Sequence, residues 1–171
     1  RVMAEFTVLH RMAGDADIAV RGRAHLADAL AHDGPLILAG LHLGNWELSI
    51  LPPVLQRLTG VDTPIRPVHT IYQPPRSRFR HRLAVRARER AGARLLPPGR
   101  PAASAAVRVL RNNGIVWIAL DDFRDRQVNG PLFGRQAGRH GNLAVAARLA
   151  AATGARVLPI YVVRDEGARF T

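Results

Sequence analysis

A histidine and a glutamate five residues apart, His42 and Glu47, form the segment of this sequence that is best suited to chemistry. They follow a continuous apolar run at residues 35–41, which indicates a strand buried on both faces. We expect the turn after that strand to bring the two side chains face to face, so that the carboxylate accepts the proton on one imidazole nitrogen. The other nitrogen can then take a proton from an attacking hydroxyl, which predicts general-base catalysis.

Covalent and metal-dependent chemistry have less support in the sequence. There is no cysteine, and no serine stands in a nucleophile elbow near His42, so direct attack by a substrate hydroxyl is favoured over a covalent intermediate. The seven His residues show no ligand pairing at helical spacing, so no metal site is predicted. A His and a Glu at this spacing also occur as an ordinary turn residue and an ordinary first-turn carboxylate, so the spacing alone identifies no function.

The elements that must position this pair alternate along the chain. Apolar runs bounded by turn residues predict strands at residues 35–41, 65–72, 115–120 and 157–163. Helical patterns occupy residues 2–12, 23–32, 76–91, 102–110 and 142–152, and a helix over residues 47–58 should break at its two prolines. Residues 124–130 are predicted to be a polar loop. This order predicts one α/β domain over residues 1–171, with a central, largely parallel sheet covered by helices.

Four further residues are candidates for the site. Asp121 ends the strand at residues 115–120 and is expected at the same sheet edge as His42, where it would orient an Arg or a substrate hydroxyl, or simply begin a turn. Arg86 and Arg88 lie in the basic stretch and would bind phosphate, support the carboxylates, or form a solvated face. Asn45 would donate to a substrate or cap the helix that follows it.

The charge of the chain restricts its partners. The formal net charge is +12, and all 25 basic residues are Arg. This excess favours a polyanionic partner, which leaves open a nucleic acid, an anionic membrane face or a phosphorylated substrate. Aromatic residues make up only 5% of the chain, which argues against a stacking platform for single-stranded nucleic acid. A basic nucleic-acid-binding domain is the alternative to an enzyme.

The full string from His42 to Glu47, HLGNWE, resembles the HxxxxD/E motif of the lysophospholipid acyltransferase superfamily, and it is most similar to the late acyltransferases of lipid A biosynthesis, the lauroyl/myristoyl type. Five further segments resemble that family in the same order: residues 20–26, 86–96, 116–121, 131–134 and 141–159. The resemblance therefore covers nearly the whole chain. Arg124 stands where the family often has Tyr or Gly, which leaves the acyl-chain length and the exact acceptor open.

The resemblance implies an acyltransferase fold and the transfer of a fatty acyl chain from an acyl-carrier-protein thioester to a hydroxyl of a lipid A precursor. It implies His42 as general base, Glu47 as its partner and no cofactor, and it favours Arg86 over Arg88 as the functional arginine. An acyl-CoA-dependent enzyme for another glycolipid, such as a phosphatidylinositol mannoside, is the nearest alternative. The expected location is the cytoplasmic face of the inner membrane.

The membrane itself is an expected partner, because a lipid acceptor is reached at a bilayer surface. No apolar run has the length of a transmembrane helix, and the chain is interpreted as a fragment, truncated at both ends, whose anchor would precede Arg1. The excess of Arg should bind anionic lipid. A stripe of Val2, Phe6, Leu9 and Met12 is the candidate for an apolar contact with the membrane, with packing on the core as the alternative.

Overall fold

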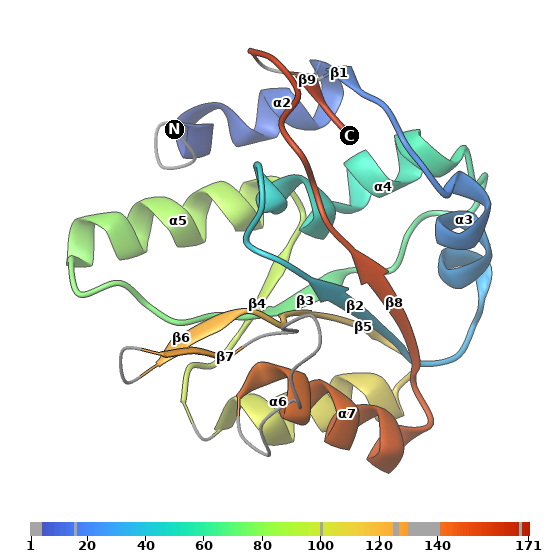
Figure 1. Ribbon diagram of the computed structural model, residues 1–171, viewed down its shortest axis with the longest axis vertical. Coiled ribbons are helices and arrows are strands. Elements are labelled where there is room, and N and C mark those ends of the chain that lie inside the picture. Colours follow the sequence, from blue (N-terminus) through green and yellow to red (C-terminus); the bar gives the residue numbers. More distant parts are fainter. Residues whose placement is uncertain (1–4, 16, 100, 125–126, 130–140, 168) are drawn as a thin grey trace.

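A five-stranded sheet forms the centre of the molecule, and all of its neighbouring strands are parallel. The computed structural model describes residues 5–15, 17–99, 101–124, 127–129, 141–167 and 169–171. Helices cover both faces of the sheet, as Figure 1 shows. The predicted α/β fold with a parallel sheet is therefore confirmed.

The strand order across the sheet is β4, β3, β5, β2 and β8. The strands are Leu36–Gly40 (β2), Val68–Ile71 (β3), Arg94–Leu96 (β4), Ile115–Ala119 (β5) and Arg156–Ile160 (β8). β2 and β5 are buried along their whole length, as their unbroken apolar runs predict. Their register pairs Gly40 with Ala119, so their carboxyl ends finish side by side even though two strands separate them in the chain.

Two hydrophobic clusters lie on opposite faces of the sheet. Leu36 and Leu38 of β2 belong to one cluster and Ile37 to the other, as the alternation of side chains along a strand requires. The first cluster packs under α2 (Leu9–Asp15), α3 (Arg23–Ala31), α4 (Pro52–Thr59) and α5 (Arg78–Arg90). The short 3-10 helix η1 (Phe6–Val8) contacts α2 and α5. The second packs under α6 (Pro101–Arg111) and α7 (Asn142–Thr153).

The helix predicted over residues 47–58 breaks where its prolines require. A 3-10 helix, η2 (Trp46–Ile50), ends before Leu51, and α4 begins at Pro52. A proline is tolerated in the first turn of a helix, where its missing N–H would have no partner, but not in the interior. The region around the catalytic candidates is therefore a short 3-10 turn rather than a long helix.

The predicted polar loop at residues 124–130 was wrong in part. The chain forms an antiparallel pair outside the main sheet, β6 (Asp122–Arg124) and β7 (Gln127–Asn129). A two-stranded ribbon away from the core needs no long apolar run, so composition alone does not reveal it. Leu95 and Leu96 lie in edge strand β4, where no strand was predicted. A third small sheet pairs β1 (Asp17–Ile18) with β9 (Arg169–Phe170).

The N-terminal apolar stripe packs on the core as far as the structure describes it. Leu9 is 1% exposed, and Met12 packs against the same cluster. Val2 lies outside the described residues. This placement supports core packing over membrane contact. Within the described part of the chain, no helix is both long enough and apolar enough to cross a bilayer.

Candidate active site

His42 and Asp121 meet at the carboxyl edge of the sheet. Each lies two residues beyond the register pair Gly40 and Ala119, so the parallel pairing of β2 and β5 brings them together. The backbone N–H of His42 donates to both carboxylate oxygens of Asp121, at 3.1 and 2.9 Å. Nδ1 of the imidazole lies 3.0 Å from Oδ1 of the same carboxylate. Asp121 therefore fixes both the backbone and the ring of His42.

The contact with Asp121 selects one protonation pattern of the ring. If Nδ1–H donates to the carboxylate, Nε2 is left as an acceptor, which is the tautomer that a general base needs. The side chain of His42 is 48% exposed and that of Asp121 is 27% exposed. The imidazole is thus held from one side and open to a substrate from the other.

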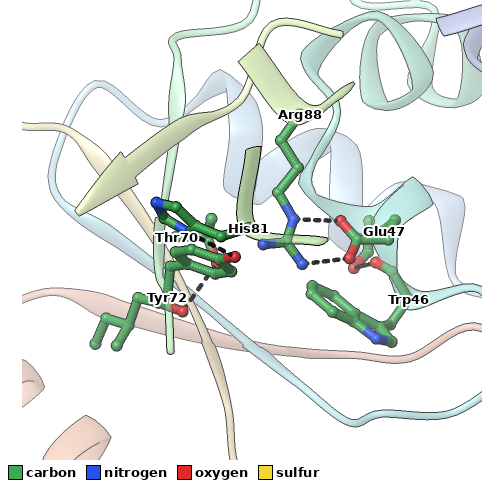
Figure 2. A network of polar contacts seen from close by, with 8 residues as sticks. Trp46, Glu47, Thr70, Tyr72, His81 and Arg88 are labelled. Carbon is green, nitrogen blue, oxygen red and sulfur yellow. Dashed lines mark hydrogen bonds and ion pairs between the residues drawn. The ribbon is translucent and has the colours of Figure 1, made fainter. Parts of the chain in front are cut away.

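Glu47 is not the carboxylate that bonds to His42, which corrects the expectation from the sequence. Among the described residues, both of its oxygens accept from Arg88, at 2.8 Å from Nε and 2.5 Å from Nη2 (Figure 2). The physical reason is topological, because η2 turns Glu47 inwards under α5, whereas Asp121 arrives beside His42 on the adjacent strand. The charges of Glu47 and His42 interact, although Glu47 hydrogen-bonds to Arg88 rather than to the imidazole.

The pair formed by Glu47 and Arg88 is buried, with side chains 1% and 5% exposed. Burial raises the pKa of the Glu47 carboxyl, while the hydrogen bond and charge of Arg88, and then the charge of His42, act in the opposite direction. The two parallel hydrogen bonds use the planar fork of the guanidinium, which makes the geometry rigid. This arrangement suits a structural anchor better than a group that exchanges protons with a substrate.

Aromatic rings connect the buried pair to the imidazole. The guanidinium of Arg88 lies between the rings of Trp46 and Tyr72, 5.1 and 4.8 Å from their centroids, as Figure 2 shows. Trp46 stacks on Trp117 at 4.9 Å and meets the His42 ring edge-on at 5.2 Å. Glu47 and Arg88 can therefore position His42 through Trp46 without touching it.

The arginine favoured from the sequence is the exposed one. Arg86 lies on the solvent side of α5, whereas Arg88, two residues later, points inwards, because residues two apart lie on different faces of a helix. The burial of Arg88 against Glu47 leaves it little surface for phosphate. The expectation that both would line one substrate site is therefore not supported by this geometry.

Asn45 is fully buried, and its amide donates to Glu5 at 2.7 Å. It makes no side-chain cap to η2, so the capping interpretation does not hold. Its burial favours a role in holding the turn over contact with a substrate. The described residues contain no group of three or more His, Cys, Asp or Glu that could hold a metal ion.

Sequence reasoning missed some members of the site. Asp121 as partner of His42 could have been found, since both residues follow buried strands and strand ends converge at one edge. Tyr72 is the last residue of a predicted strand and directly follows β3, and its hydroxyl lies 3.3 Å from Nδ1 of His81. Burial raises the pKa of Tyr72, against the charge of Arg88. Glu5, at the N-terminal end of the chain, carried no signal.

An apolar cavity of about 570 Å³ lies next to the site. Leu48 and Ser49, which follow Glu47 in η2, form part of its wall. The rest of the lining comes mainly from α3, α4 and the segment that begins with β8, and includes Leu26, Val54, Leu55, Leu158, Ile160 and Val162. Its dimensions and lining suit an aliphatic chain.

Comparison with known proteins assigns the chain to a family. No curated protein matches the chain. The family of bacterial lipid A biosynthesis acyltransferases matches it over residues 1–171. The chain therefore belongs to the bacterial lipid A biosynthesis acyltransferase family, which is a family of transferases.

Proposed function

We propose that this protein transfers a fatty acyl chain from an acyl-carrier-protein thioester to a hydroxyl of a lipid A precursor, with His42 as the general base. The observation that carries the proposal is the half-exposed imidazole whose Nδ1 lies on the Asp121 carboxylate, 3.0 Å away. The family supplies the reaction class and the lipid A pathway. The donor and the roles of the residues are the proposed part.

The chemistry is one acyl transfer without a covalent enzyme intermediate. Nε2 of His42 takes the proton as the acceptor hydroxyl oxygen forms a bond to the thioester carbonyl carbon. Asp121 stabilises the imidazolium that results, as a hydrogen-bonded carboxylate does. Collapse of the tetrahedral intermediate breaks the C–S bond, and the imidazolium returns its proton to the departing thiolate. No residue is consumed and no cofactor is required.

The direct test removes the base. In the full-length protein, His42→Ala should reduce turnover by about 10²–10⁴-fold, the usual contribution of a general base. His10→Ala is the matched control, since His10 is exposed on α2 and lines a different pocket, beside Arg57 and Arg90. Turnover is measured with an acyl-carrier-protein donor and a lipid A precursor. An unchanged rate in His42→Ala would refute the assignment.

The apolar cavity is proposed to hold the acyl chain. Leu58, at the end of α4, is partly buried and lines it. Leu58→Trp should fill part of the volume and shift donor preference towards shorter chains, while Leu58→Met, which conserves volume, should leave the preference unchanged. Competition between donors of different chain length measures the shift. Equal preference in the wild type and Leu58→Trp would place the chain elsewhere.

The exposed N-terminal part of α5 is proposed to rest on the cytoplasmic leaflet. It carries Arg78, Arg80 and Arg82, all exposed, around Phe79, which is 70% exposed. Each basic residue near an anionic surface contributes about 1 kcal/mol. A large exposed aromatic side chain among these cations adds an apolar contact beside the charges.

This membrane contact has a matched control. Phe79→Ser should weaken sedimentation with anionic vesicles, whereas Val157→Ser, which removes an exposed apolar side chain on β8, should not. Equal loss in both variants would contradict a specific role for α5. Preferential binding to nucleic acid over vesicles at equal salt would support the alternative of a basic nucleic-acid-binding domain.

The acceptor is tested in cells. A deletion strain should lack one secondary acyl chain on its lipid A. An intact lipid A with altered mannolipids would favour the alternative, an acyl-CoA-dependent enzyme for another glycolipid.

A further inference from the structure

Three residues from distant parts of the chain meet at the turn that carries His42. Asn45 Nδ2 donates to Glu5 Oε2 at 2.7 Å, and Arg164 Nη2 donates to Glu5 Oε1 at 2.5 Å. Glu5 precedes η1, Asn45 lies between His42 and Glu47, and Arg164 follows β8. The carboxylate of Glu5 thus joins the two ends of the described chain to the centre of the catalytic segment.

This turn has little support of its own. Asn45 has φ −105° and ψ 76°, outside regular helix or strand, and makes no capping bond. Gly44 has φ +54°, and a Cβ there would lie 2.5 Å from the carbonyl oxygen of Val162. Only a glycine avoids both the left-handed strain and this contact. The conformation of the turn therefore depends on the segment that holds Val162 and Arg164.

Each partner in the network is constrained. Asn45 is fully buried, and the side chains of Glu5 and Arg164 are only 19% and 17% exposed. Arg164 also donates to the Gly167 carbonyl at 2.5 Å and covers the ring of Phe170, with its guanidinium carbon 4.6 Å from the centroid. A charge-assisted pair at this exposure is stronger than one on the open surface. The position of Arg164 is thus fixed by more than its ion pair with Glu5.

The turn is therefore held at three points: His42 by Asp121, Glu47 by Arg88 and Asn45 by Glu5. We propose that Glu5 and Arg164 are positioning residues that set the place of His42 by fixing Asn45. This inference rests on the proposed role of His42 as the base. A displacement of about 1 Å at a catalytic group can cost about 10²-fold in rate.

The experiment compares substitutions within the network in the full-length protein. Glu5→Ala and Asn45→Ala should each lower kcat by about 10–10²-fold with KM nearly unchanged, since the bond positions a group rather than binding substrate. Glu5→Gln keeps one acceptor oxygen for two donors and should retain an intermediate rate. Glu166→Ala is the control, because it removes an exposed ion pair with Arg169 near the same segment.

Two readouts separate positioning from a simple loss of stability. The double variant Glu5→Ala/Asn45→Ala should be no slower than the worse single variant, because both remove the same bond. The stack of Trp46 on Trp117 gives a near-ultraviolet circular dichroism signal, taken as the difference from the Trp46→Phe counterpart. That signal should change in Glu5→Ala at a temperature where the protein is fully folded, and not in Glu166→Ala.

The outcomes are distinct. Wild-type kcat in folded Glu5→Ala and Asn45→Ala, together with an inactive His42→Ala, would overturn this inference and leave the proposed function standing. Full activity in His42→Ala would refute the proposed function itself. Additive losses in the double variant would also overturn the inference. If Glu5→Ala does not fold, the rate and the circular dichroism spectrum of Glu5→Gln replace its values in the test. Wild-type values of both quantities would then overturn the inference.

Discussion

Two carboxylates serve the same histidine from opposite environments. Asp121 is partly exposed and bonds directly to His42, whereas Glu47 is buried and bonds to Arg88. Both are acids at the edge of one sheet, yet one faces the reacting space and the other the core. In the proposed mechanism, the surroundings of each carboxylate, rather than its residue type or its closeness to His42 in the sequence, assign the proton-handling role. Four predictions test this difference between the partly exposed Asp121 and the buried Glu47.

The largest effect should follow from Asp121→Asn. The amide can hold the ring yet favours the wrong tautomer, so we expect kcat to fall by about 10³–10⁴-fold with little change in stability. Steady-state kinetics alongside thermal unfolding measure the two quantities. A mild loss of rate would place Glu47, rather than Asp121, as the functional partner of His42.

Arg88→Ala should mainly lower the free energy of unfolding, and any loss of activity should follow from that loss of stability. Removing one partner of a buried pair leaves the other charge uncompensated, which costs about 3–5 kcal/mol of unfolding free energy. Chemical denaturation measures the change. If the variant unfolds like the wild type but loses activity, Arg88 contacts the substrate, and the pair that it forms with Glu47 is not purely structural.

The pH dependence of stability tests the charge state of Glu47. Burial raises its pKa in the folded protein, so its contribution to stability is present below the unfolded value and is lost as pH rises through the folded pKa. We therefore expect the stability of the wild type relative to Glu47→Gln, which does not titrate, to decline as pH rises above the ordinary value of 4.5. Urea unfolding across this range measures it. If the stability relative to Glu47→Gln instead rises with pH, the effect of Arg88 on the pKa of Glu47 outweighs the effect of burial.

The smallest effect is expected at Arg86. Its side chain is exposed on α5, on a different face of the helix from the buried Arg88. Arg86→Ala should change unfolding free energy by less than about 0.5 kcal/mol, and kcat should stay near the wild-type value. A large rise in KM for the lipid acceptor would instead restore the phosphate-binding role that the sequence suggested.

The regular elements were predictable because their signals are local. Unbroken apolar runs located β2 and β5, and two prolines located the break between η2 and α4. His42 stood out because it follows a buried strand in a recognisable motif. The ribbon of β6 and β7 was not predicted, since its residues carry no apolar pattern that distinguishes a strand from a loop.

The sequence by itself determined the fold class, the choice of His42 as the candidate base and the family resemblance. Each of these rests on patterns of residues that are close together in the chain. Only the tertiary structure decided which acid meets the histidine. Asp121 reaches His42 because β5 inserts beside β2, 79 positions away in the chain, and Glu47 turns inwards because Arg88 lies above it. The contact between Glu5 and Asn45 is equally non-local. Such pairings arise from strand register and helix packing, which link residues that no short motif contains.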